Sequence, residues 1–165
     1  MSSQAEPKTK RPTHYSKEVI EQSALKILPE VMAWIKDADA DDVSSEQDVL
    51  FYLIKAVRGN HDAYDFARNL ERYHLSPNFD LCEILNNFST YSAHTELVKQ
   101  WVAAEGVTLA LAVGQEVETA RGRGRITELR HETAQYIVTP PDDQKFKNGG
   151  GGWIIDAEDV VPVTA

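Results

Sequence analysis

The chain has 165 residues, of which 42% are hydrophobic, and this is enough for one ordinary domain or two small ones with a buried core. Its 17 lysine and arginine residues stand against 26 acidic residues, and the net charge of −9 opposes binding of the whole chain to nucleic-acid backbones or anionic membranes. The single cysteine, Cys82, excludes an intramolecular disulfide and favours a reducing, cytoplasmic location.

Residues 1–14 are mostly polar and are predicted to form a disordered tail. They lack the apolar core of a secretory signal, and no later stretch is apolar over the length needed to cross a bilayer. Lys8, Lys10 and Arg11 form a local basic cluster that an acidic partner could contact. The alternative, which we favour, is that these charges are simply solvated, as in most short polar termini.

Residues 15–107 are predicted to be a helical domain, because apolar residues recur there at helical spacing. Pro29 should kink or restart the first helix, and Ser45 should cap the second. The pair Ser76 and Pro77 is a strong signal for a further helix start, and Gly106 should end the last helix. Short connections should pack these four to five helices into one small cluster.

Residues 108–165 instead show glycines, β-branched residues and alternating polarity, which predict five short strands. So few short strands suit a small closed barrel, whose closure removes the exposed strand edges. The fold class is therefore predicted to be α+β, with a helical cluster first and a five-stranded barrel second. The five segments are GQEVETA, RITELRH, AQYIVT, WII and VVPV.

The order of residues in this second part is also informative. It runs through Val113-Gly114, Glu116-Val117, Gly122, Gly124, Ile126, Tyr136-Ile137-Val138, Trp153-Ile154 and Ala157-Glu158-Asp159-Val160. This order resembles an SH3-like small barrel of the KOW or Tudor type. The resemblance implies a glycine-containing turn after the first strand and a one-turn helix before the last strand. Such barrels serve nucleic-acid, peptide and structural roles, so the resemblance predicts fold more than function.

The acidic run KDADADDVSSEQD has the spacing of a calcium-binding EF-hand loop when Asp37 is counted as its first residue. Asp42 stands where that loop needs glycine, and Asp48 is shorter than the usual bidentate glutamate. We therefore predict no metal site. Asp37, Asp39, Asp41 and Asp42 are predicted instead to contact a partner with a basic surface.

Catalytic motifs are absent from the sequence. The five histidines have no metal-ligand spacing, and no nucleophile elbow or phosphate loop is present. Cys82 lies between Asp80 and Glu83, which oppose formation of a reactive thiolate. We therefore expect no enzymatic activity and no cofactor, and an enzyme of unknown class is only the third possibility.

The segment TPPDDQKFKNGGGG joins two predicted strands and is long for a simple connection. Phe146, between Lys145 and Lys147, could anchor a partner by becoming buried on binding, or the segment could be a connection and nothing more. Trp153 should lie either in the barrel core or half exposed on its face, and it joins Phe146 among the candidate partner-binding residues.

The segment ARGRGRI places three arginines two residues apart, at Arg121, Arg123 and Arg125. In a continuous strand all three would face one side and suit phosphate contacts. Gly122 and Gly124 instead favour a hairpin turn that fans the arginines around its tip. Glutamates of the neighbouring strands could then neutralise them. These glutamates are Glu116, Glu118, Glu128 and Glu132.

The leading functional prediction is a non-enzymatic protein-binding module with a basic partner. The whole chain loosely resembles small phage or mobile-element proteins, which implies an inhibitor or modulator of a host complex that handles nucleic acid. The alternative is nucleic-acid binding through Arg121, Arg123, Arg125 and Lys145. No membrane partner is expected, because the chain is acidic.

Overall fold

A computed structural model describes residues 7–38, 44–57, 62–141 and 151–163. Its contacts divide the chain into two compact units, Pro12–Leu97 on one side and Met1–Arg11 together with Val98–Ala165 on the other. We call these the helical unit and the sheet unit. The sequence placed the boundary between the two parts at 107/108, whereas the contacts place it inside the last α-helix. The second half of that helix belongs with the sheet because Val98, Trp101 and Val102 pack against Ala134.

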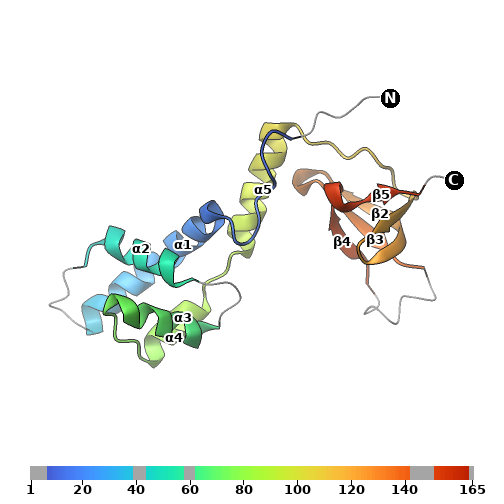
Figure 1. Ribbon diagram of the computed structural model, residues 1–165. Helices are drawn as coiled ribbons and strands as arrows, with labels where there is room; N and C mark the ends of the chain where they lie inside the picture. Colours follow the sequence, from blue (N-terminus) through green and yellow to red (C-terminus); the bar gives the residue numbers. More distant parts are fainter. Residues whose placement is uncertain (1–6, 39–43, 58–61, 142–150, 164–165) are drawn as a thin grey trace. The chain divides into compact units, whose positions relative to one another are not determined.

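The helical unit is built from helices around one core (Figure 1). Its fully buried side chains include Val31 of the first helix, Leu53 of the second, Leu70 of the third and Leu81 and Leu85 of the fourth. Residues three to four positions apart meet on one face of a helix, which is why the helical spacing in the sequence located this core. The helices are α1 (Lys17–Ala38), α2 (Glu46–Ala56), α3 (Ala63–Leu70), the one-turn helix η1 (Glu71–Tyr73), α4 (Phe79–Asn86) and α5 (Tyr91–Glu105), which continues into the sheet unit.

The helix ends agree with the sequence in part. Ser45 caps α2 as predicted, in a reciprocal capping box with Asp48. The predicted start at Ser76 and Pro77 is wrong, because Asn78 caps α4 by accepting a hydrogen bond from the Leu81 amide at 3.0 Å. The Asn78 side chain was the better cap because the same oxygen also accepts the indole N–H of Trp34 at 3.0 Å.

Two further expectations concern proline and glycine. Pro29 does not restart the first helix, since α1 continues through it as one element. Gly106 ends α5 as predicted: it has a φ of +65°, and the amide of Val107 bonds back to the carbonyl of Val102.

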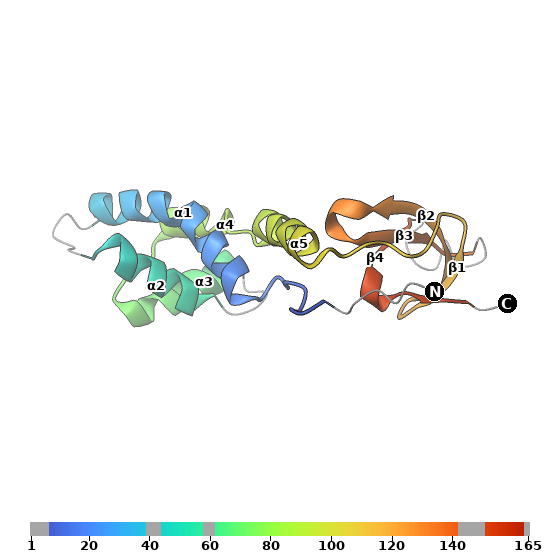
Figure 2. The same cartoon turned by 90° about the horizontal axis from the view of Figure 1, so that it is seen from above.

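The sheet unit contains a five-stranded antiparallel sheet in the order β4-β3-β2-β1-β5. Strands β2 and β3 lie side by side in both views (Figure 1, Figure 2). The α+β class is therefore confirmed, while closure of the sheet into a barrel is not, because β4 and β5 do not pair in the described residues. The elements are β1 (Glu116–Thr119), β2 (Gly122–Arg130), η2 (His131–Thr133), β3 (Gln135–Thr139), β4 (Trp153–Asp156), η3 (Ala157–Asp159) and β5 (Val161–Pro162).

The sheet buries a second, smaller core on one face, with Val117, Ile126, Tyr136, Val138 and Trp153 each at most 4% exposed. Alternation along the strands puts these side chains inside and their neighbours outside. The helical unit and the sheet unit therefore each have their own apolar core. No helix in the described part of the chain has the length and apolarity of a membrane span.

We predict that Gly124→Ala destabilises the sheet unit by about 1–3 kcal/mol, because β2 and β3 approach closely at this position. A Cβ atom there would lie 2.5 Å from Cγ1 of Val138 and 2.8 Å from the backbone oxygen of Thr139. Denaturant unfolding of the variant measures the loss. Gly151→Ala is the matched control, since a Cβ at Gly151 meets nothing within 4 Å. Equal stability of the two variants would contradict the close approach.

Candidate functional site

The acidic residues predicted to contact a partner are only partly described. Asp37 lies in the last turn of α1 and is exposed. Asp39, Asp41 and Asp42 lie outside the described residues. Within the described ranges, no group of three or more His, Cys, Asp or Glu side chains is arranged to hold a metal ion.

The arginine segment forms the predicted hairpin, but with a narrower tip than expected. The turn consists of Ala120 and Arg121, and Gly122 supplies the positive φ of +115°. Arg123 and Arg125 therefore lie within β2 rather than at the tip, and Gly124 is there for close packing and not for a positive φ.

Each of the two strand arginines is paired with a glutamate directly opposite it on β1. Arg123 Nε lies 2.8 Å from Glu118, and an Nη of Arg125 lies 3.2 Å from Glu116. The predicted neutralisation across the strands is thus confirmed for these two residues. Exposed pairs of this kind contribute at most about 1 kcal/mol each, so they add little to the stability of the sheet.

The predicted aromatic anchors have different positions. Trp153 begins β4 and is 4% exposed, so of the two alternatives left open by the sequence, the core position is the one observed. It packs with Tyr136 and Val138 and presents little surface to a partner. Phe146 and Lys145 lie outside the described residues.

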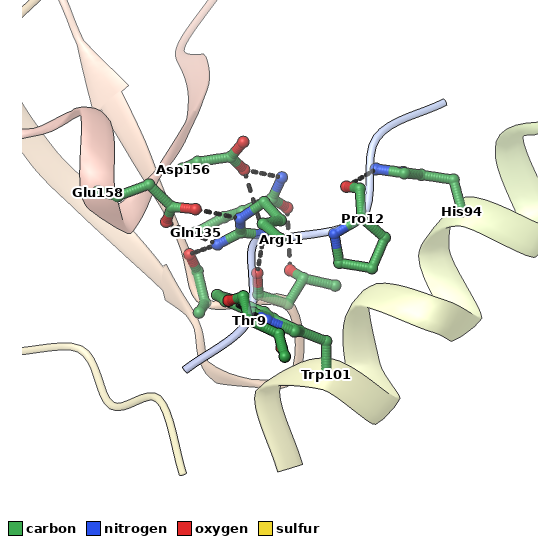
Figure 3. Close-up of polar contacts among 10 residues, drawn as sticks. Thr9, Arg11, Pro12, His94, Trp101, Gln135, Asp156 and Glu158 are labelled. Atoms are coloured by element: carbon green, nitrogen blue, oxygen red, sulfur yellow. Dashed lines mark hydrogen bonds and ion pairs between the residues drawn. The ribbon is translucent and has the colours of Figure 1, made fainter. Parts of the chain in front are cut away.

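The densest group of polar contacts involves a residue that sequence analysis assigned to a solvated tail. Residues 8–11, which we call the arm, lie against the second half of α5 and against the turns that follow β2 and β4. The Arg11 side chain is only 9% exposed. Figure 3 shows it pointing toward Glu158 and Asp156.

The Arg11 guanidinium is bound by both carboxylates and backbone carbonyls. Nε and Nη2 donate to the two oxygens of Glu158 at 2.6 and 3.0 Å, which is a bidentate ion pair. Nη1 donates to the carbonyl of Thr133 at 2.8 Å and Nη2 to that of Ala134 at 2.9 Å. Asp156 adds a second carboxylate 3.4 Å from Nη1. All three guanidinium nitrogens are thus engaged, and the group made of these five residues is called the arginine site.

The turn that offers the two carbonyls has an unusual backbone. Ala134 has a φ of +48° and is completely buried, although a left-handed conformation is uncommon for alanine. Its carbonyl also accepts the Ala157 amide at 3.0 Å, so contacts within the sheet unit maintain this conformation. Backbone conformations of this kind are often found where a protein grips a ligand. Gln135 completes the turn by donating to Asp156 at 2.8 Å.

Trp101 and Glu105 of α5 hold the rest of the arm. The guanidinium carbon of Arg11 lies 5.0 Å from the centre of the Trp101 ring, within cation–π range. The indole N–H of Trp101 donates to the carbonyl of Thr9 at 3.1 Å. The Glu105 carboxylate accepts the Lys8 amide at 2.7 Å and the Thr9 hydroxyl at 2.6 Å. The arm is therefore held through its backbone as well as through Arg11.

These contacts also affect the carboxyl groups. Burial raises the pKa of Glu158, but the hydrogen bond and charge of Arg11 outweigh burial and keep this pKa below its ordinary value. The Thr9 hydroxyl and the Lys8 amide hold the pKa of Glu105 below its ordinary value in the same way. Both carboxylates are therefore ionised at neutral pH and favour a cation.

Two histidines of the helical unit lie close together. The rings of His14 and His94 are stacked with centroids 3.9 Å apart, and His94 Nε2 donates to the carbonyl of Pro12. Burial and the neighbouring His94 lower the pKa of His14, so His14 favours its uncharged form. Nδ1 of His14 also forms a hydrogen bond with the Thr90 hydroxyl, at 3.0 Å.

The sequence could not show the arginine site, because its members lie up to 147 positions apart. The only local signal is the basic cluster at Lys8, Lys10 and Arg11, and such a cluster near a chain end predicts solvated side chains. Comparison of the chain with protein-family models, with curated proteins and with solved structures finds no match.

We predict that Glu158→Gln releases the arm. The variant loses the bidentate ion pair but keeps the side-chain size. Because the site is half exposed, the free energy of arm attachment should weaken by about 1 kcal/mol. Trypsin should then cut after Lys8 and Lys10 about fivefold faster, since cleavage follows the population of the open form. Asp159→Asn, one residue further along, is the matched control. Equal cleavage of both variants would show that Glu158 does not hold the arm.

We also predict that the arm detaches as the pH falls. Glu158 and Glu105 have lowered pKa values only while the arm is bound, so the free-arm state takes up protons first. Attachment should stay complete from pH 7 down to the ordinary pKa of glutamate and be lost as the pH falls through the lowered values. The indole N–H resonance of Trp101 reports this change. A resonance that stays constant until the whole chain unfolds would contradict it.

Proposed function

We propose that the protein is a non-enzymatic protein-binding module whose partner presents a basic surface. The observation that supports this most is the segregation of charge between the two units. The helical unit has 7 lysine and arginine residues and 15 acidic residues, for a net charge of −8, while the sheet unit has 10 and 11, for −1. Such an imbalance attracts a cationic partner and speeds its association.

The exposed aromatic side chains support a protein as the partner. Among the described residues the exposed large aromatics all belong to the helical unit, and aromatic residues are enriched where proteins bind one another. Acidic and aromatic groups on one unit suit a basic protein surface, since they supply charge attraction together with apolar contact. These residues are Tyr15, Phe51, Tyr64, Phe79 and Tyr91.

We also propose that the sheet unit is an SH3-like barrel. The strand order, with β5 beside β1, and the one-turn helix η3 directly before β5 support this assignment. The loose resemblance of the chain to small phage or mobile-element proteins extends the proposal to the partner, a host complex that handles nucleic acid. In such a complex the basic surface would be the one that otherwise meets the phosphate backbone.

Nucleic-acid binding by the hairpin arginines has less support. Arg123 and Arg125 are each paired with a glutamate on the same face, and the sheet unit as a whole is not basic. A strong nucleic-acid binder usually concentrates its basic residues in the domain that binds.

The test begins with affinity capture from host extract and identification of the partner by mass spectrometry. Lysine replacement of Asp39, Asp41 and Asp42 should then weaken binding about tenfold or more and flatten its salt dependence. Lysine replacement of Asp142, Asp143 and Asp159 changes the net charge by the same amount in the sheet unit and is the matched control. Equal loss in both variants would mean that net charge alone acts, and unchanged affinity in the first would reject the proposed surface.

A further inference from the structure

We propose that the arginine site binds an extended, arginine-bearing peptide segment of a partner protein, and that the chain's own arm occupies this site in cis. The described residues that bond to the arm or stack on it lie between Trp101 and Glu158 in the sheet unit. The site is therefore separate from the acidic helical unit on which the proposed function rests.

The geometry of the site selects arginine over lysine. Four N–H···O bonds reach Nε, Nη1 and Nη2 of Arg11 from three different residues, and all of them use the planar fork of the guanidinium. A lysine ammonium is a single point with three donors and cannot reach these acceptors together. The Trp101 ring adds a face on which a guanidinium stacks well.

The site also selects for peptide backbone. Trp101 donates to the carbonyl two residues before the arginine, and Glu105 accepts an amide three residues before it. The Glu105 contact to the Thr9 hydroxyl favours a serine or threonine at the position two before the arginine. A free arginine or a guanidinium salt would lack these contacts, so the ligand class is a peptide segment of the pattern Ser/Thr-X-Arg.

The arm can be replaced by another segment, because most of it lies at the surface. Residues 7–10 are exposed, so these residues bury little apolar surface of their own while the arm is attached. Glu158 remains 47% exposed and Asp156 33% exposed in the bound state, which puts both carboxylates at the surface. The carbonyl turn persists without the arm, because the Ala134 conformation is maintained by bonds to His131 and Ala157. Release of the arm would thus leave a formed and accessible site.

The arm competes with a partner segment because its tether keeps it close to the site. A short tether keeps a cis ligand at an effective concentration in the millimolar range. A partner segment with the same contacts must therefore overcome the arm, and removal of Arg11 should strengthen its binding. This dependence distinguishes a binding site from a contact that only ties down the end of the chain.

The test uses a fluorescent peptide with the sequence of residues 6–14, EPKTKRPTH, and the full chain in about 0.15 M salt, where long-range charge effects are screened. The Arg11→Ala chain should bind it at least tenfold more tightly than the wild type does. A peptide with lysine in place of its arginine should bind that chain at least fivefold more weakly. Adding Glu158→Gln to the Arg11→Ala chain should also weaken binding.

Several outcomes would overturn the proposal. A folded Arg11→Ala chain that binds no peptide, or that binds the arginine and lysine peptides equally, excludes an arginine-selective site. If Arg11→Ala does not fold, the milder Arg11→Lys chain is used with the same expectations. Lysine replacement of Asp39, Asp41 and Asp42 should leave peptide affinity unchanged, and a loss there would assign the peptide to the helical unit. A wild-type dimer that Arg11→Ala abolishes would assign the site to arms of other copies instead of a partner.

Discussion

The guanidinium of Arg11 is the point at which distant parts of the sheet unit meet. The arm, the second half of α5, the turn after β2 and the turn after β4 all contact it or its neighbours. Closing such long loops costs conformational entropy, which grows slowly with loop length and has to be offset by the contacts made. A side chain with donors in several directions is suited to this, because one residue can bond to several backbone segments at once.

A small cluster of apolar side chains lies close to the Arg11 contacts. Val98, Trp101 and Val102 of α5 bury against Ala134, and this cluster forms the support beneath the carbonyl turn. The arginine site thus has an apolar base and a polar rim, which is the usual composition of a peptide-binding surface. The charged contacts themselves contribute little to stability, since their carboxylates remain partly exposed to water. These carboxylates and carbonyls therefore serve specificity, because their arrangement fits a guanidinium.

The sequence predicted most of the architecture and little of the site. Helical spacing located the first core and alternation located the strands, because both signals are local and follow from the geometry of the backbone. The Ser45 cap and the Gly106 stop were correct for the same reason. The start of α4 was missed because the Asn78 side chain serves the helix and Trp34 together, and the second contact spans 44 positions. The contact between Arg11 and Glu158 spans 147 positions, and no periodicity in the sequence predicts it.

The two arginine environments in this chain differ in a way that local sequence cannot show. Arg123 and Arg125 attract attention by their spacing, yet their side chains are 70% and 63% exposed and each has one glutamate partner. Water competes for such pairs, so either partner can be lost at small cost. Arg11 stands in an unremarkable terminus, yet its side chain is 9% exposed and has four acceptors at hydrogen-bond distance. Removal of this shielded cation leaves carboxylates and carbonyls in an arrangement that fits another guanidinium. Shielding and the number of fixed acceptors, rather than the density of arginine in the sequence, therefore decide which basic residue marks a binding site.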